Sequence, residues 1–306
     1  MCTKISIESR GSKNRVDPFK PYAWLVEKER TATGEIEDIA IIFLTNRECP
    51  WHCLMCDLWK NTTDITVPAG AIPGQIEWAL KQFSGVKHIK LYNSGSFFDT
   101  RAVPYADYRE IAGLLSDFKT VIVESHPRLI NEKCLSFREM LKPELHVAMG
   151  LETVHPDILK KLNKQMSAED FKNAARFLTD NDVLTRAFIL LKPPFMNEAE
   201  GIFWAERSLD FAFGCGVECC TVIPVRAGNG VMEMLQKQGN FSPPSVRSLE
   251  KVLEYGIGLN AGRVFADTWD IHLFSECKKC SGKRSERITR MNLEQKILNT
   301  VECNCE

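Results

Sequence analysis

Short apolar runs alternate along the chain with longer segments in which apolar residues recur at helical spacing. The apolar runs predict buried strands, and the spaced segments predict amphipathic helices between them. The predicted strands cover residues 39–46, 87–93, 119–125, 144–151, 184–192 and 218–225. Examples of the predicted helices are 75–84, 104–117, 168–180 and 198–213. This alternation is typical of repeated βα units, which place their strands in one parallel sheet.

Six βα units predict an α/β fold, namely a partial (β/α)6 TIM-like barrel with an N-terminal extension and a Cys-containing C-terminal extension. The expected divisions are an extension over 1–36, the barrel domain over 37–262 and a second extension over 263–306. Ser167 and Asp170 have the spacing of a capping box at the start of one helix. Reactive groups are expected at the carboxyl ends of the strands, as in other parallel α/β folds.

Composition and charge indicate the size of the core, the partners and the cellular location that we expect. The chain has 306 residues, of which 44% are hydrophobic, so it can bury a substantial core. Its formal net charge of −1 gives no overall attraction to nucleic acid, so binding to a polyanion would need a local patch. We find no apolar run of about 18 residues and no signal-peptide pattern, and we therefore expect a cytoplasmic protein with no membrane contact. In that compartment the 12 cysteines are expected as thiols or metal ligands rather than disulfides.

Three cysteines follow the first predicted strand with the spacing Cys-x3-Cys-x2-Cys, at Cys49, Cys53 and Cys56. Three thiolates suit a [4Fe–4S] cluster, because the missing fourth ligand leaves one iron free to bind a small molecule. A structural zinc site is an alternative, with His52 as the nearest further ligand. A disulfide is a second alternative, although three close cysteines cannot all pair.

Polar residues gather where the other predicted strands end. The candidates for ligand binding are Asn93, Ser94, Gly95, Ser96, Glu124 and Glu152, and the candidates for a catalytic role are Glu152, Lys192 and Arg226. Each has a simpler alternative: an ordinary turn for 93–96, a helix cap or ion pair for the glutamates, and a strand end for Lys192. Arg226 stands before a Gly-Asn-Gly run that would let the backbone approach a ligand, and it could hold a carboxylate or phosphate in two hydrogen bonds. A solvated turn is the alternative there.

Four more cysteines stand near the C-terminus as two hooks, Cys277 with Cys280 and Cys303 with Cys305. Two hooks predict one closed site for zinc or for an auxiliary iron–sulfur cluster, and a tail that binds nothing is the alternative. Basic residues between the hooks predict a face suited to a tRNA backbone, although such faces are also common as solvated surface. These residues are Lys278, Lys279, Lys283, Arg284, Arg287 and Arg290.

The spacing of the first three cysteines after a strand resembles the radical S-adenosylmethionine (radical SAM) superfamily. In its elongator-like branch a Gly/Ser turn ends the second strand, and residues 91–99 look like it. An acidic residue ends the third strand of that branch, matched by Glu124, and a Gly-Leu-Glu-Thr stretch ends the fourth, matched by 150–153. The resemblance implies that the three cysteines bind the cluster and that the turn meets the amino group of SAM.

Within that branch, residues 150–171 and 188–195 look most like the archaeosine-synthase radical SAM subunit and its uncharacterised bacterial relatives. Met55 is a small departure, since the family usually has an aromatic residue before the third cysteine. The resemblance implies a reduced cluster that cleaves SAM to methionine and a 5′-deoxyadenosyl radical, which then abstracts hydrogen from a substrate. It also implies an electron donor such as flavodoxin or ferredoxin.

The sequence leaves two alternatives for the substrate: a modified tRNA base or a small-molecule metabolite. Near-zero net charge favours the metabolite or a partner subunit that delivers the RNA. A further alternative within SAM chemistry is transfer of a 3-amino-3-carboxypropyl group. The non-enzymatic alternative is a metal-binding interaction protein.

Overall fold

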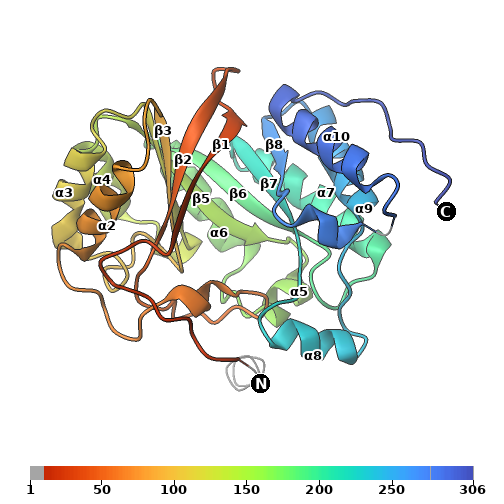
Figure 1. The fold of residues 1–306 in the computed structure, drawn as a ribbon, viewed down its shortest axis with the longest axis horizontal. Helices are drawn as coiled ribbons and strands as arrows, with labels where there is room; N and C mark the ends of the chain where they lie inside the picture. The colour runs from red at the N-terminus through yellow and green to blue at the C-terminus, as the bar shows by residue number, and fades with distance from the viewer. Residues whose placement is uncertain (1–9, 276, 306) are drawn as a thin grey trace.

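The computed structural model describes residues 10–275 and 277–305, which form one curved eight-stranded sheet with helices outside it (Figure 1). The strands lie in the sheet in chain order, and every neighbouring pair is parallel except β1 and β2. They are β1 (Ala23–Arg30), β2 (Ile36–Leu44), β3 (His88–Asn93), β4 (Thr120–Ser125), β5 (Glu144–Glu152), β6 (Leu184–Leu191), β7 (Cys219–Pro224) and β8 (Arg263–Ala266). The predicted partial barrel is therefore confirmed.

Helices connect the strands and cover the outer face of the sheet. Figure 1 shows α2, α3 and α4 on one side, and α7, α9 and α10 on the other. The α-helices are α2 (Ala71–Leu80), α3 (Tyr108–Leu114), α4 (Glu132–Met140), α5 (Pro156–Lys161), α6 (Ala168–Thr179), α7 (Glu198–Gly214), α8 (Val231–Lys237), α9 (Val246–Gly258) and α10 (Ser281–Glu294). Short 3-10 helices are η1 (Leu58–Asn61), η2 (Tyr105–Asp107), η3 (Pro127–Leu129) and η4 (Ile271–Phe274).

Alternation along each strand decides which side chains face the helices. On β3, Ile89 and Leu91 are fully buried in the core between the sheet and the helices. Successive side chains of a strand point to opposite faces, so Lys90 and Tyr92 point into the barrel. Tyr92 there contacts Phe188 of β6 at 6.3 Å between ring centroids, although β3 and β6 are not neighbours in the sheet. The apolar side chains of the strand thus pack against the outer helices, and its polar side chains point into the barrel, where they can contact a ligand.

A buried ion-pair network fills the amino-terminal end of the barrel. Glu29 of β1 lies 2.6 Å from Lys90 Nζ and 2.5 Å from Arg186 Nη2. Arg263 of β8 donates to the backbone oxygen of Arg30 on β1. These side chains join strands from distant parts of the sheet, and the antiparallel β1 thereby helps to close the barrel at this end.

The strands and helices agree with the sequence pattern to within a few residues at most ends. The capping box before α6 is confirmed, because Ser167 and Asp170 each bond the other's backbone amide. β1 lies inside the expected N-terminal extension and was not predicted, since its apolar run covers only residues 23–26 and its second half is charged. The expected division at 36 and 262 stays a prediction, although β1 and β8 both pair with strands of the barrel domain.

None of the helices in the described residues combines the length and the apolar character that crossing a membrane requires.

Candidate functional site

Three thiols stand on the cysteine loop, which we define as residues 45–57 between β2 and η1. Cys49, Cys53 and Cys56 are all partly buried free cysteines. Burial raises the pKa of the Cys49 thiol to about 11 and those of Cys53 and Cys56 to about 12. The thiols are therefore protonated at neutral pH in the metal-free protein, and metal binding must release protons.

The Gly/Ser turn after β3 lies directly against this loop. A Cβ atom added to Gly95 would be 3.0 Å from Cys49 Cβ, and Gly95 has φ +105. A side chain there would strain the backbone and press tightly on the first cysteine, so the turn favours glycine. Two predicted ligand contacts in this turn, Asn93 Oδ1 and Ser94 Oγ, are buried without a hydrogen-bond partner among the described residues. Such orphaned polar atoms beside three thiols are consistent with a bound ligand.

Ser96 is the last predicted ligand contact of the turn, and unlike Asn93 and Ser94 it has a hydrogen-bond partner. Its hydroxyl is 2.8 Å from Ser125 Oγ, so it already has a partner at the end of β4.

Glu152 forms a buried ion pair at the end of β5. The register of β5 on β6 shifts between Gly150 and Glu152, and Glu152 adopts φ 66. Its Oε1 is 2.6 Å from Lys164 Nζ, with both side chains largely buried. A Cβ atom on Gly150 would come within 2.5 Å of the Lys164 amine, so this glycine makes room for the pair.

Lys164 is a site residue that we did not predict, although it belongs to the segment that carries the family resemblance. Burial alone would lower its pKa, but Glu152 and the nearby thiols Cys53 and Cys49 outweigh this and raise it. The sequence gave no spacing signal for Lys164, because it stands in a loop after α5 and reaches the site only through the fold.

Glu124 lies inside the barrel near the same end, among aromatic rings. Burial raises its pKa to about 8, so the carboxyl is mostly protonated at neutral pH. Phe43 and Tyr92 have ring centroids 6.0 Å apart, and Tyr22 lies 5.6 Å from Phe43. The inner wall beside Glu124 is thus suited to a ligand with flat or apolar parts.

Lys192 contacts neither the cysteine loop nor the Glu152–Lys164 pair among the described residues. Its amine is 2.6 Å from Glu198 and 2.9 Å from Ser242 Oγ, on segments that follow β6 and α8. Lys192 also has φ 54, and a Cβ atom on Gly201 would strike its side chain. A catalytic role for Lys192 stays a prediction, and the contacts describe an internal ion pair.

Arg226, at the end of β7, pairs with acidic residues that follow β8. Its Nη2 is 2.6 Å from Asp267 Oδ2, and its Nη1 is 3.7 Å from Asp270. Burial raises the pKa of Asp267 despite this contact. A substrate anion would have to replace these carboxylates, so the predicted role of Arg226 stays untested.

The four C-terminal cysteines come together as one compact group. The sulfur atoms of Cys277, Cys280, Cys303 and Cys305 all lie within 4.8 Å of one another. Cys277 Sγ is 3.8 Å from Cys303 Sγ, and Cys280 Sγ is 3.8 Å from Cys305 Sγ. Backbone amides of Cys280 and Lys279 lower the pKa of Cys277 to about 6, which favours the thiolate. This group could bind a metal ion, and in the described part of the chain it is the one group of three or more ligands so arranged.

Two arginines donate hydrogen bonds to these sulfurs. Arg247 Nη2 is 3.1 Å from Cys305 Sγ, and Arg284 Nε is 3.4 Å from Cys280 Sγ. Their positive charges offset the negative charge that four thiolates would bring to a divalent metal.

The predicted basic face of α10 is smaller than its sequence indicates. Arg284 pairs with Glu250, and Arg287 Nη2 lies 2.6 Å from Glu254, so both arginines are buried against α9. These ion pairs hold α10 against α9, because a buried charge without a partner would destabilise the fold. Arg290 pairs with Glu294 at 2.9 Å. Lys278, Lys279 and Lys283 stay exposed and have no such pair with another described residue.

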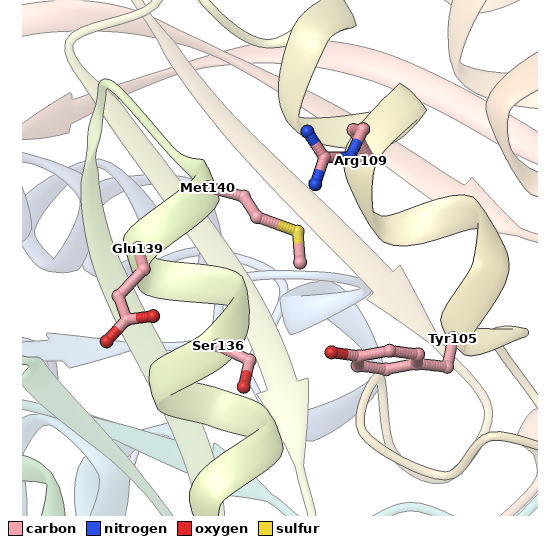
Figure 2. Close-up of a pocket in the computed structure, with 5 residues that line it drawn as sticks. All are labelled: Tyr105, Arg109, Ser136, Glu139 and Met140. Atoms are coloured by element: carbon pink, nitrogen blue, oxygen red, sulfur yellow. The ribbon is translucent and has the colours of Figure 1, made fainter.

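A pocket on the outside of the molecule is separate from these groups (Figure 2). It is lined by Tyr105, Arg109, Ser136, Glu139 and Met140. All five come from η2, α3 and α4 in the outer helix layer, so the pocket contains none of the predicted site residues.

Two curated relatives match the chain over most of its length, whereas no family model matches it. An uncharacterised protein of Methanocaldococcus jannaschii is 28% identical over 95% of this chain and 86% of its own length. Archaeosine synthase subunit beta of Methanosarcina acetivorans is 25% identical over 89% of this chain and 84% of its own length.

Solved structures agree on the fold. Elp3 of the archaeon Methanocaldococcus infernus superposes with a TM-score of 0.53 and 17% identity, covering 72% of this chain and 58% of that one. SuiB of Streptococcus suis, solved with bound S-adenosylmethionine, gives a TM-score of 0.56 and 13% identity over 78% of this chain and 50% of that one. The fold expected from the cysteine spacing is therefore confirmed: the chain shares the fold of these two proteins, and over most of its length it is similar to archaeosine synthase subunit beta.

Proposed function

We propose that this protein is a radical SAM enzyme that reductively cleaves S-adenosylmethionine at a [4Fe–4S] cluster to give a 5′-deoxyadenosyl radical, which abstracts hydrogen from a substrate. The observation that carries the proposal is the meeting of three elements at one end of the barrel. The cysteine loop, the Gly95 turn and the Glu152–Lys164 pair come from distant parts of the sequence; the first two are partly buried and the ion pair is largely buried. A protein that only stored metal would not need the last two.

The donor set fits the cluster. Cys49, Cys53 and Cys56 would supply three thiolates, and they do not form a compact group of the kind that holds a single ion. When bound, the cluster supplies the electron and an open iron for SAM. The chain's own task is then to hold SAM and exclude water.

Residues around the loop have chemistry that suits SAM. Asn93 and Ser94 offer to its amino group oxygen atoms that have no partner among the described residues. The Lys164 ammonium would pair with its carboxylate, which requires it to loosen its contact with Glu152. Glu152 would then be free to accept hydrogen bonds from ribose hydroxyls. Protonated Glu124 and the rings of Tyr92 and Phe188 would line the substrate side.

For the substrate we propose a modified base in tRNA. The support is the name of the Methanosarcina relative, archaeosine synthase subunit beta, together with the exposed Lys278, Lys279 and Lys283. Three lysines are a small electrostatic footprint for RNA, and the relative is one subunit of a larger enzyme. We therefore propose that a partner subunit binds most of the tRNA, and that a flavodoxin or ferredoxin supplies electrons in the cytoplasm.

A small-molecule substrate is the second candidate. It is favoured by the net charge of −1 and by the burial of Arg284 and Arg287, which removes two cations from the predicted RNA face. Salt separates the two substrates, because tRNA affinity falls steeply as counterions are added. Replacing Lys278, Lys279 and Lys283 together should weaken tRNA binding and leave turnover of a metabolite intact.

We propose that the metal at the C-terminal cysteines is zinc. Zinc–sulfur bonds of about 2.3 Å in a tetrahedral shell place the sulfurs about 3.8 Å apart. That is the separation of the Cys277–Cys303 and Cys280–Cys305 pairs, at 3.8 Å each. An auxiliary iron–sulfur cluster is larger and would hold its thiolates farther apart.

The test of the main proposal is anaerobic reconstitution followed by electron paramagnetic resonance of the reduced protein, with and without SAM. A cluster signal that SAM perturbs, and that is absent after replacing Cys49, Cys53 and Cys56 with Ala, is the expected result. Product analysis then identifies the bond that is cleaved. 5′-Deoxyadenosine supports this proposal, whereas methylthioadenosine supports 3-amino-3-carboxypropyl transfer. A reconstituted protein whose signal ignores SAM would refute the proposal.

A further inference from the structure

Two asparagines from outside the cysteine loop hold its backbone. Asn229 lies between β7 and α8 and is buried. Its side-chain amide donates to the backbone oxygen of Leu54 at 2.8 Å and to that of Cys56 at 3.1 Å. One NH₂ group thereby fixes the segment that carries the third cysteine.

Asn163, which follows α5, makes the matching contact on the other arm of the loop. Its side-chain amide donates to the backbone oxygen of Trp51 at 2.8 Å and to that of His52 at 3.1 Å. Beside it, the backbone amide of Leu54 donates to Leu162 O at 2.9 Å. The contacts of Asn163 fall between the first and second cysteines, and those of Asn229 follow the second.

The loop needs such partners because it contains no helix and no extended strand. Backbone carbonyls outside regular structure must find donors elsewhere, or they remain unsatisfied when buried. Each asparagine offers two N–H donors on one rigid planar group, which matches two carbonyls of a turn. Both arms of the loop are thus bonded to the barrel mouth without any contribution from a metal.

The residues around Asn229 favour its contact with the cysteine loop. Its Oδ1 accepts a hydrogen bond from Met232 N at 2.9 Å, so the side chain also caps α8. Gly228 and Gly230 on either side have φ 136 and φ 86, which other residues adopt with strain. The Gly-Asn-Gly run therefore turns one side chain inward between α8 and the cysteine loop.

From these contacts we infer that Asn163 and Asn229 are positioning residues that hold the cysteine loop in its ligand-bearing form before the cluster is bound. This rests on the proposed function, because it takes the loop to be the cluster's binding site. Neither residue supplies a ligand. Their effect is to reduce the ordering that cluster binding must otherwise impose on a flexible loop.

Two variants test the inference by different chemistry. Asn229→Asp keeps the oxygen that caps α8 and loses the NH₂ group that bonds the loop. Asn163→Gly keeps the backbone freedom that φ 56 requires and removes the side chain. Asn240→Asp is the matched control, since Asn240 is exposed just beyond α8. The first measurement is hydrogen exchange of the metal-free, full-length protein, and the second is the rate at which a chelator removes iron after reconstitution.

In both variants, but not in the control, loop amides should exchange about tenfold faster, which corresponds to about 1.4 kcal/mol and is in the range of two lost hydrogen bonds. Iron should also be lost about tenfold faster, with unchanged exchange in β5 and β6. Loop exchange within twofold of wild type in both variants would overturn the inference. So would a parallel rise throughout the barrel strands, because the asparagines would then be general fold residues. Wild-type protein that binds no iron would refute the proposed cluster, whereas the exchange comparison would still decide this inference.

Discussion

Replacing Glu29 with Gln should destabilise the barrel far more than its small chemical change suggests. The Glu29 carboxylate is 2.6 Å from Lys90 Nζ and 2.5 Å from Arg186 Nη2, and all three side chains are almost fully buried. The amide of Gln is similar in shape and carries no charge. Arg186 would then be a buried cation whose counter-ion is missing, and breaking such a pair costs about 3–5 kcal/mol.

Urea unfolding measures this cost directly. With a slope of about 3 kcal/mol/M, the expected loss lowers the unfolding midpoint by about 1–2 M. Glu27→Gln is the matched control, because Glu27 lies on the same strand and contacts the same lysine at 2.6 Å, but its side chain is 44% exposed. An exposed pair contributes under about 1 kcal/mol, so the control should move the midpoint by less than about 0.3 M. Equal shifts for the two variants would show that the buried network does not stabilise the fold.

The pH dependence provides a second check of the same network. Burial alone would raise the pKa of Glu29, but Arg186 and Lys90 outweigh burial and hold it well below 4.5. The unfolded chain therefore binds a proton that the folded chain does not, and the stabilisation is present above about pH 4.5 and lost as pH falls below it. The gap between wild type and Glu29→Gln should shrink in acid, and a gap that stays constant down to pH 3 would contradict this account.

Three further substitutions probe the site. Gly95→Ala should sharply lower iron loading on reconstitution, because its Cβ would lie 3.0 Å from Cys49 Cβ on a backbone at φ +105; Gly113→Ala, a helical glycine with open space around it, should load normally. Glu124→Gln should be more stable than wild type at pH 8 and equal to it near pH 4.5, because a folded pKa of about 8 makes wild-type stability fall as pH rises through that window; identical urea midpoints at both pH values would contradict this. Cys277→Ser should reduce bound zinc by elemental analysis and loosen residues 277–305 to proteolysis, and unchanged zinc content would place the metal elsewhere.

The sequence predicted those features whose residues all lie within one short segment. The parallel strands appeared as short apolar runs, because the face of each strand that packs against the outer helices needs apolar residues. The capping box at Ser167 and Asp170 involves residues three apart, so its geometry follows from helix formation alone. The spacing of Cys49, Cys53 and Cys56 likewise placed three thiols on one loop before any fold was known.

Prediction failed where a side chain's role depends on distant partners. Lys164 stands between α5 and α6, and no spacing in the sequence predicted it. Its amine meets Glu152 because the register of β5 shifts there and because Gly150 has no side chain in the way. Arg284 and Arg287 looked like a free basic face but are buried against Glu250 and Glu254 of α9.

The sequence by itself determined the class of fold, the three-thiol loop and the two C-terminal hooks, because periodicity and short spacing are properties of neighbouring residues. Only the tertiary structure decided that the four hook cysteines meet within 4.8 Å, that Lys164 pairs with Glu152, and that Asn163 and Asn229 bond the cysteine loop. Those contacts join residues far apart in the chain. They form because the closing sheet brings their segments to one end of the barrel, and that closure depends on the packing of the whole chain.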